Sequence, residues 1–246
     1  MIPKLLHYCW FGPAPKSDRV LRCIESWSRW LPDYQVVAWT EENSPLGEPY
    51  VQAACARGGW SRASNFIRLH ALHEYGGIYL DTDAEVIKPL DPLLGDECFI
   101  GFQRKRKYNH WVNCAVLGAV KGQPFLKRCL DRLRVRFTEK GEFPFGPELV
   151  TSVLIEMGLK HYGLQQLEGV RLYPHEYFYP YPWLAHFHPV RITPATHIIH
   201  YWEHSRYDLH KLPLSLKVRG GLYDLQSKLL WWLRLTRNLI RSGGGA

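Results

Sequence analysis

The chain has 246 residues, of which 46% are hydrophobic and 22% are charged, and this composition excludes an intrinsically disordered protein. The length fits one large α/β domain with a small appendage. Lysine and arginine outnumber aspartate and glutamate by 31 to 23, and the net charge of +8 favours anionic partners such as sugar nucleotides, phospholipid headgroups or nucleic acid without choosing among them.

Targeting signals and cysteine usage indicate where in the cell the protein is expected. No stretch approaches the roughly 18 uninterrupted apolar residues of a membrane-spanning helix, and the first ten residues lack the apolar core and cleavage site of a signal peptide. The six cysteines form no C-x-x-C pair and lie in apolar contexts, which favours reduced, buried thiols, although their even number leaves disulfides open. We therefore expect a cytoplasmic protein, either free in solution or peripheral at the inner face of the cell membrane.

The chain opens with a strand, a helix and a second strand. An apolar run at residues 5–10 ends at Phe-Gly-Pro and predicts a buried strand. Ser17 can cap a helix that ends at Pro32, with apolar residues at helical spacing: Val20, Leu21, Ile24, Trp27 and Leu31. Residues 34–39 are rich in β-forming side chains. This order predicts the opening of a parallel sheet.

The next two elements lead into a pair of carboxylates. Residues 61–75 predict a helix that Gly76 stops, and residues 78–80 predict a short buried strand followed by Asp81 and Asp83. Burying unpaired carboxylates is costly, so we expect positive charge beside them. Side chains at i and i+2 can converge on one Mg²⁺ or Mn²⁺ where a strand opens into a loop. The motif alone fits a divalent metal site and a solvated turn equally well.

The rest of the chain predicts further elements of an α/β fold. We expect strands at residues 98–102, 114–120 and 196–202, a helix at 124–137, and a folded loop at 173–183. Residues 222–240 show a helical pattern rich in leucine and tryptophan, with basic residues interleaved. Trp231 and Trp232 either pack against the rest of the protein or, with the basic run at 104–108, attract an anionic membrane surface.

The block at residues 61–86 resembles the glycosyltransferases of family 32, because Tyr-Gly-Gly-Ile-Tyr-Leu precedes the Asp-Thr-Asp motif and Ala-Glu-Val-Ile follows it. Residues 2–12 and 23–34 resemble the family's first strand and helix, and weaker signatures extend the resemblance to about residue 206. The family is similar to the catalytic domains of clostridial glucosylating toxins. The resemblance implies an α/β fold of GT-A type, with a Rossmann-like, mostly parallel sheet flanked by helices. Residues 1–211 are then the catalytic domain, 212–241 a basic amphipathic helical extension and 242–246 a disordered tail.

The activity implied by the resemblance is metal-dependent transfer of a sugar from a nucleotide sugar to a hydroxyl of a glycan or a lipid-linked acceptor, with retention of configuration. Mn²⁺ ranks before Mg²⁺ as the cofactor, and a UDP-sugar ranks before a GDP-sugar as the donor. The motif holds no clear covalent nucleophile, so we expect attack on the front face, where the protein contributes position and electrostatics.

The resemblance also implies roles for individual residues. Asp83 binds the metal, and Asp81 contacts the ribose, the donor sugar or metal-bound water. His200 supplies a further contact to the metal or the diphosphate. Arg68 reaches the donor with its planar charged fork, or else forms a surface salt bridge with Glu74.

Further donor contacts follow from the same resemblance. Trp10 lies against the nucleotide base, and the other contacts are Ser64, Asn65, Tyr79, Asn113 and Ser205. Most relatives have aspartate where this chain has Asn65, so the identity of the sugar does not transfer from a relative. Residues 146–148 are either an acceptor-side loop or the ordinary start of a helix, at which Glu148 is favoured by the helix dipole.

Two other classes of protein are open. A metal-dependent phosphohydrolase or nucleotidyltransferase also places carboxylates at strand ends, but it needs further clustered acids that are missing near a second strand. A nucleic-acid-binding module would explain the positive charge and the aromatic residues. It would not explain Asp81 and Asp83, because negative charge weakens binding to phosphate, so we expect no nucleic-acid partner.

Overall fold

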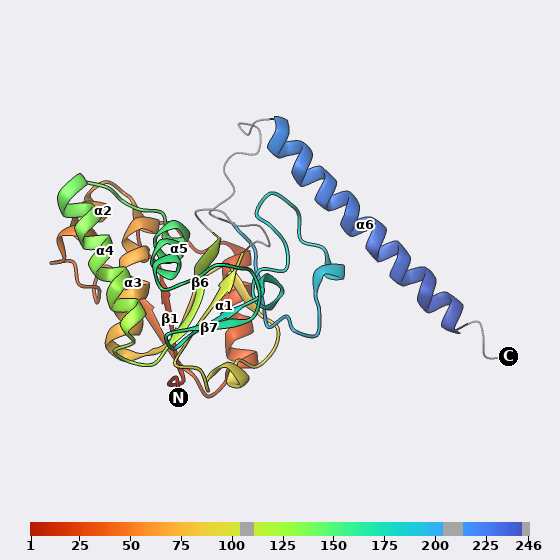
Figure 1. Ribbon diagram of the computed structural model, residues 1–246, viewed down its shortest axis with the longest axis horizontal. Helices are drawn as coiled ribbons and strands as arrows, with labels where there is room; N and C mark the ends of the chain where they lie inside the picture. The colour runs from red at the N-terminus through yellow and green to blue at the C-terminus, as the bar shows by residue number, and fades with distance from the viewer. Residues whose placement is uncertain (104–110, 204–213, 243–246) are drawn as a thin grey trace.

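The computed structural model describes residues 1–103, 111–203 and 214–242. Its centre is a seven-stranded sheet with the order β2-β1-β3-β6-β5-β8-β7 (Figure 1). The strands, in that order, are Gln35–Trp39, Leu5–Cys9, Gly77–Leu80, Val112–Ala119, Cys98–Phe102, Val170–Tyr173 and Gln165–Leu167. β6 and β7 run opposite to the other five strands, so the sheet is mixed and mostly parallel, as predicted.

Helices and a small second sheet cover the two faces of the large sheet (Figure 1). One face carries α2 (Pro49–Ala56), α3 (Trp60–Tyr75), α4 (Pro124–Lys140) and α5 (Gly146–Glu156). The other face carries α1 (Asp18–Trp30) and the antiparallel pair of β4 (Ala84–Val86) and β9 (Ile198–His200). Short 3-10 turns lie at Asp91–Leu93, His175–Tyr177 and Pro189–Arg191. The result is three layers with the sheet in the middle.

Two hydrophobic cores lie on the two faces of the sheet, because side chains alternate along each strand. On β3, Ile78 and Leu80 join the core under α1, whereas Tyr79 between them joins the core under α3. On β5, Phe99 and Ile100 divide in the same way. All four residues of β3 are buried, as expected for a strand covered on both faces. The strand that leads to the aspartate pair is therefore held from both sides.

The helix α1 begins as its sequence predicts. The hydroxyl of Ser17 accepts a hydrogen bond from the backbone N–H of Val20 at 3.3 Å, which is an N-cap. Val20 and Trp27 are buried, but Leu21 is 52% exposed, so its place on the apolar face was wrong. One residue along a helix is a turn of about 100°, which takes Leu21 away from the buried stripe.

Two adjacent glycines connect α3 to β3. Gly76 has φ +70 and donates its N–H to the carbonyl of Leu72 at 2.9 Å, which ends the helix. Gly77 has φ +110, and a Cβ there would lie 2.5 Å from the carbonyl oxygen of Leu5. Both the positive φ and the close approach to β1 require glycine. This turn lets β3 pair with β1 and carry Asp81 to the edge of the sheet.

Several elements depart from the sequence-based expectation. Four elements were not predicted: α2, β4, β7 and β8. The strand expected at 196–202 pairs only over Ile198–His200, and the C-terminal helix α6 runs over Leu214–Ser242 rather than from residue 222. The basic run at 104–108 and most of the tail at 242–246 lie outside the described residues.

The helix α6 projects from the rest of the protein (Figure 1). Across residues 1–103, 111–203 and 214–242, no helix is both long and apolar enough to cross a membrane. All six cysteines are free thiols, and five of them are buried. Cys55 is only partly buried.

Candidate functional site

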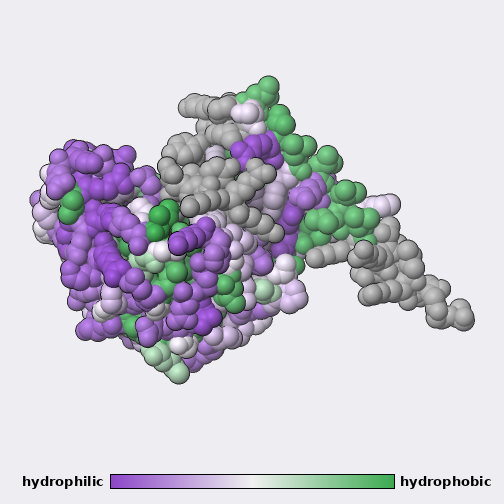
Figure 2. All heavy atoms as spheres, in the orientation of Figure 1, coloured by the Kyte–Doolittle hydropathy of each residue, from purple (hydrophilic) through white to green (hydrophobic). Residues whose placement is uncertain are grey.

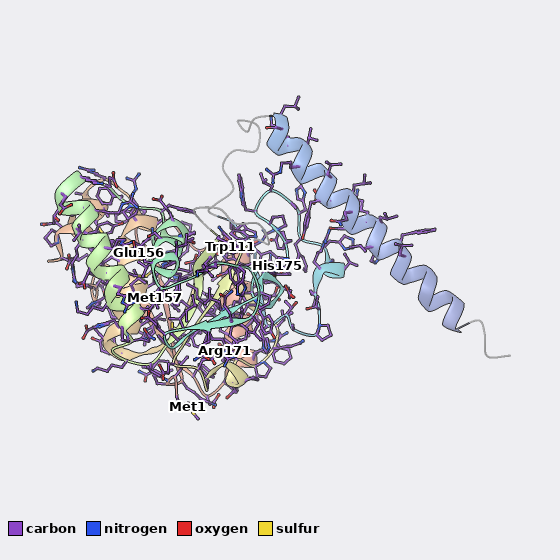
Figure 3. The ribbon with its side chains drawn as sticks, in the orientation of Figure 1. Met1, Trp111, Glu156, Met157, Arg171 and His175 are labelled. Atoms are coloured by element: carbon purple, nitrogen blue, oxygen red, sulfur yellow. The ribbon has the colours of Figure 1, made fainter. Side chains whose placement is uncertain are left out.

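The candidate site lies at one edge of the large sheet. β1 and β3 end there, and β6, which runs in the opposite direction, begins there. Figure 3 places Trp111, directly before β6, near this end of the sheet and Met1 at the opposite end. The backbone N–H of Asp81 still bonds the carbonyl of Ala115 at 2.8 Å, so the first aspartate is fixed to the sheet. Ligands of open α/β sheets bind at the carboxyl ends of the strands, where these residues lie.

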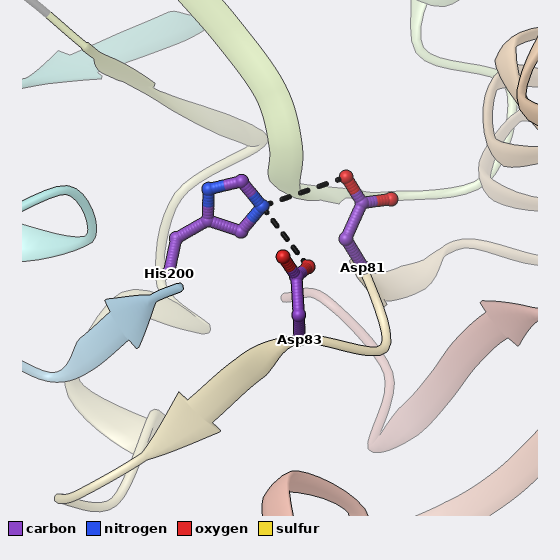
Figure 4. A group of neighbouring side chains, drawn as sticks. All are labelled: Asp81, Asp83 and His200. Carbon is purple, nitrogen blue, oxygen red and sulfur yellow. Dashed lines mark ion pairs between the residues drawn. The ribbon is translucent and has the colours of Figure 1, made fainter. Parts of the chain in front are cut away.

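Asp81, Asp83 and His200 meet at this edge (Figure 4). β4 follows Asp83 and pairs with β9, which sets His200 opposite Ala84. The Nε2 of His200 lies 3.2 Å from Oδ1 of Asp83 and 3.8 Å from Oδ2 of Asp81. One donor atom from each side chain lies within 4.8 Å of the other two. The pairing of two short strands thus joins residues that are far apart in the sequence.

Burial and the neighbouring carboxylates have opposite effects on the protonation of His200 in the trio of Asp81, Asp83 and His200. The side chains of His200 and Asp83 are only 4% and 6% exposed, whereas that of Asp81 is 29% exposed. Burial acts to lower the pKa of His200, but the carboxylates of Asp83 and Asp81 outweigh it and raise this pKa to about 9. A protonated His200 therefore offsets part of the negative charge of the two aspartates.

The trio has the donor chemistry of a divalent cation site. Carboxylate oxygens suit Mg²⁺ and Mn²⁺, and an imidazole nitrogen is a common ligand of divalent transition metals. The partial exposure of Asp81 leaves a side from which a ligand can approach. A cation would displace the proton of His200, because imidazole binds metal only through a deprotonated nitrogen. The residues present fit a bound metal.

His200 is oriented mainly by aromatic packing. The rings of Trp202 and Tyr179 lie edge-on to it, with centroids 4.4 and 5.7 Å away. Among the described residues, its Nδ1 is buried without a hydrogen-bond partner. Trp202 has φ +60, an uncommon conformation for a residue with a side chain, and its indole N–H bonds the carbonyl of Tyr181 at 3.0 Å. Two aromatic residues therefore hold the imidazole in position.

Asp83 is fixed by the backbone that follows His200. Its Oδ2 accepts the N–H of Glu203 at 2.7 Å, and its own carbonyl accepts the N–H of Tyr201 at 3.0 Å. Oδ1 is the oxygen that faces His200. The N–H of Glu203 therefore helps to orient the Asp83 carboxylate, while the bond to Tyr201 fixes the backbone of Asp83.

Arg68 provides the positive charge that the aspartate pair required. Its Nη2 lies 3.1 Å from Oδ1 of Asp81, and its side chain is 7% exposed. Nε donates to the carbonyl of Ser64 at 3.1 Å, and Nη1 donates to the carbonyl of Cys114 at 2.9 Å. The alternative of a surface salt bridge with Glu74 is wrong, since Arg68 is buried and points to the site. Each of its nitrogens already bonds a protein acceptor.

Tyr79 supports the same carboxylate from β3. Its hydroxyl donates to Oδ1 of Asp81 at 3.1 Å, and the guanidinium of Arg68 lies 4.6 Å from the centre of its ring. Burial raises the pKa of Tyr79 well above its usual value, so the hydroxyl keeps its proton. Asp81 is thus held by one cation and one neutral donor.

The other predicted donor-binding residues differ in their burial. Trp10 follows β1 and is partly exposed, its indole N–H bonds the carbonyl of Ala14 at 3.1 Å, and Lys16 lies 5.0 Å from its ring. Asn113 is buried, donates to Gln103 at 2.7 Å and accepts the N–H of Ala115 at 2.8 Å. Their proposed contacts to a base and a sugar stay predictions.

Ser64 and Asn65 lie on α3, on the same side of the sheet as Arg68. The hydroxyl of Ser64 donates to the carbonyl of Trp60 at 3.0 Å. A Cβ on Gly146 would lie 2.8 Å from Oδ1 of Asn65, so the start of α5 closes over this side chain. Glu148, in the first turn of α5, pairs with Arg136 at 2.8 Å. Ser205 lies outside the described residues.

Sequence reasoning missed the residues that orient the trio. Tyr179, whose hydroxyl accepts the N–H of Val116 at 3.0 Å, comes from the segment expected to be only a folded loop. Trp202 and the backbone N–H of Glu203 follow β9. Their roles depend on contacts between distant segments, for which the local sequence carries no signal.

Two family models cover most of the chain in succession. Residues 17–100 match the glycosyltransferase sugar-binding region containing a DXD motif, and residues 118–212 match the conserved region of α-1,4-glycosyltransferases. The first match contains the Asp81-Thr82-Asp83 motif and the second contains His200. Both models describe glycosyltransferases, and their matched regions follow one another along the chain.

Curated proteins similar to this chain are also glycosyltransferases by name. One is inositol phosphoceramide mannosyltransferase 3 of Schizosaccharomyces pombe, 29% identical over 152 residues, which are 58% of the chain and 40% of that protein. Another is lactosylceramide 4-alpha-galactosyltransferase of Mus musculus, 29% identical over 193 residues, which are 72% of the chain and 48% of that protein. The chain spans less than half the length of each of these two relatives.

The fold of this chain is of GT-A type, as predicted. The solved structure of the PaToxG glycosyltransferase superposes with a TM-score of 0.51 and 22% identity, over 63% of this chain and 69% of that one. This likeness concerns the arrangement of the sheet and helices.

Proposed function

We propose that this protein is a glycosyltransferase that moves a sugar from a nucleotide sugar to a hydroxyl of a glycan or glycolipid. The observation that supports it best is the convergence of Asp81, Asp83 and His200 at the carboxyl edge of the sheet, in a chain whose residues 17–100 match the DXD-motif glycosyltransferase model. The two relatives named above take their names from ceramide-containing compounds, which favours a lipid-linked acceptor. A UDP-sugar is our first choice of donor and a GDP-sugar our second.

Asp81, Asp83 and His200 are the residues that would hold Mn²⁺, or Mg²⁺ as second choice. When bound, such a cation acts as a Lewis acid that neutralises charge on the leaving diphosphate. The protein's part is to keep three donors in one place before the donor arrives. The contacts of Asp83 to residues 201 and 203 and the aromatic packing of His200 do this, and such preorganisation favours the transition state.

Arg68 and Tyr79 hold Asp81 in place, and Arg68 would keep positive charge close to the leaving group. Arg68 is anchored by the carbonyls of Ser64 and Cys114, so its charge stays at a fixed distance from the aspartate pair. Trp10 is partly exposed and is suited to pack against the base, and we assign Asn65 and Asn113 to the sugar. We further propose retention of configuration through front-face attack.

A donor screen tests this function. Purified protein is incubated with individual UDP-sugars and GDP-sugars, with and without Mn²⁺, and release of the nucleoside diphosphate is measured. We expect slow, Mn²⁺-dependent release from one donor, lost in Asp83→Ala. Glu85→Ala is the matched control, because Glu85 lies two residues further on and bonds the hydroxyl of Tyr201 at 2.6 Å instead of joining the trio. Undiminished release by Asp83→Ala would overturn the proposed role of the motif.

The same screen separates the transferase from a phosphohydrolase. A transferase releases an intact nucleoside diphosphate, whereas a phosphohydrolase cuts the diphosphate and releases a nucleoside monophosphate. Within the described ranges, Asp81, Asp83 and His200 form the one group of three or more potential metal ligands. A second cluster of acids, which a two-metal hydrolase uses, is not found there, and we therefore expect the diphosphate.

A further inference from the structure

The face of α6 that contacts the rest of the protein makes mostly polar contacts. Gly220 lies against the backbone of residue 184, where a Cβ would come within 2.3 Å of the carbonyl oxygen. Asp224 pairs with His186 at 2.9 Å, and Ser227 accepts a hydrogen bond from Arg191 at 2.9 Å. Residues 220, 224 and 227 are spaced by four and three, so they share one helix face. This face attaches α6 through close backbone contact, polar bonds and the ring of Tyr223, which packs against the core under α1.

The opposite face of α6 is apolar and exposed. Its residues follow the same spacing, are between 51% and 63% exposed, and form what we call the outer stripe: Val218, Leu222, Leu225, Leu229 and Trp232. Figure 2 shows apolar surface along α6, against a largely hydrophilic surface on the visible side of the main body. In Figure 3 many of the drawn side chains of α6 point away from the main body. A surface helix normally turns its apolar stripe inward, and α6 does the reverse.

The charge of α6 is almost all positive. Between residues 214 and 242 there are six basic residues and one acid: Lys217, Arg219, Lys228, Arg234, Arg237, Arg241 and Asp224. At 100° per residue, Lys217 and Lys228 fall on one flank of the outer stripe and Arg219 on the other, and all three are exposed. Asp224 lies on the inner face with His186. The outer stripe is therefore bordered by cations.

We propose that the outer stripe seats this protein on an anionic lipid bilayer, with α6 lying along the headgroup region. An interfacial helix combines an apolar face, basic flanks and tryptophan, as α6 does. The spacing of the stripe also suits a coiled-coil seam with a second copy. A second copy, however, would bring the same basic flanks together, whereas anionic headgroups complement them. This inference goes beyond the proposed function and does not depend on glycosyl transfer.

Vesicle flotation tests whether the outer stripe binds an anionic bilayer. The full chain is mixed with vesicles of phosphatidylcholine alone or of phosphatidylcholine with phosphatidylglycerol, and the floated fraction gives a partition coefficient. We expect binding to the anionic vesicles and little to the neutral ones. Leu225→Glu combined with Leu229→Glu should lower the coefficient roughly tenfold for each leucine. The matched control is Leu21→Glu combined with Leu164→Glu, because both leucines are exposed to a similar degree, 52% and 54%, outside α6.

A second pair of substitutions tests the basic flank of the outer stripe. Lys217→Gln combined with Lys228→Gln should weaken binding to the anionic vesicles roughly fivefold for each charge removed. Thermal unfolding of every variant checks that the main body remains folded. Equal binding by the stripe variant and the control variant would overturn the proposal. So would a dimer in light scattering that the stripe variant dissociates, since the stripe would then bind a second copy.

Discussion

At the scale of single residues, the site is a balance of four charges. Asp81 and Asp83 bring two negative charges, and Arg68 and protonated His200 bring two positive ones. Leaving a buried carboxylate without a partner would cost several kcal/mol, so the metal-free protein keeps the proton on His200. A bound cation can take over the place of that proton without leaving either carboxylate unpaired.

Arg68 allows a test of this balance by a small change. Arg68→Lys keeps the charge but loses the planar fork that reaches Ser64, Cys114 and Asp81 together. We expect the free energy of unfolding, measured by urea denaturation, to fall by about 2 kcal/mol. Arg134→Lys, at a pair with Glu48 whose arginine side chain is 43% exposed, should cost less than about 1 kcal/mol. Equal losses in the two variants would contradict the structural role given to Arg68.

The roles of these residues could be predicted from the sequence to different degrees. Asp81 and Asp83 follow from a local motif, because a strand that ends in two nearby acids needs a cation. The role of His200 was predicted from family resemblance, because no residue near it in the sequence indicates that it lies beside Asp83. Tyr179 and Trp202 could not be predicted, because their contacts to His200 form only when β9 pairs with β4.

At the scale of elements, the turn from α3 into β3 is the most constrained connection. Gly77→Ala places a Cβ 2.5 Å from the carbonyl oxygen of Leu5 at φ +110, so it should cost at least about 2 kcal/mol of unfolding free energy. Gly122→Ala is the matched control, with φ +73 and no atom within 4 Å of its Cβ, and should cost about 1 kcal/mol. Urea denaturation of both variants measures the difference. A Gly77→Ala protein as stable as Gly122→Ala would contradict the close packing of β3 on β1.

His7 links β1 to its neighbours in a state that depends on pH. Its Nε2 donates to the carbonyl of Gly76 at 2.8 Å, and its Nδ1 accepts the indole N–H of Trp39 at 3.2 Å, so the buried ring must be neutral. Burial lowers its pKa below 6.5, and the carbonyl of Gly76 only partly opposes this. The unfolded chain then binds more protons than the folded one, and stability falls as pH drops below about 6.5.

Thermal unfolding between neutral and mildly acidic pH checks the effect of His7. His7→Gln can keep both hydrogen bonds without titrating, so its unfolding temperature should fall less on acidification than that of the wild type. His161→Gln is the control, because His161 is exposed. His200 affects stability in a different pH range. Because its pKa is raised to about 9, the metal-free protein loses stability when His200 loses its proton as pH rises through about 9. A His7→Gln slope equal to that of the wild type would count against the neutral ring.

The elements that sequence predicted are those with a strong local pattern. The strand at 98–102 has the expected bounds, and α1 and α3 carry clear caps or stops. The short helix α2 begins at Pro49 with no side-chain cap, and β7 and β8 span only three and four residues. Such elements are held by packing and pairing more than by their own sequence.

At the scale of the whole molecule, the elements around the large sheet pack through two hydrophobic cores, whereas α6 makes mostly polar contacts with the rest of the protein. The sheet is packed on both faces, and the trio lies where β3 leaves it. α6 attaches through a polar face and contacts Pro189–Arg191, with Tyr223 packing against the core under α1. We propose on this basis that residues 1–211 form the catalytic domain and residues 212–241 an extension of it.

The central claim is that Asp81, Asp83 and His200 bind the cation that holds the diphosphate of a nucleotide sugar. The direct measurement is a crystal structure of the protein grown with Mn²⁺ and the donor identified by the screen, with anomalous diffraction collected at the manganese edge. We predict an anomalous peak within coordination distance of all three side chains, with the diphosphate beside it. A donor bound elsewhere, with no anomalous peak between the two aspartates, would contradict the account.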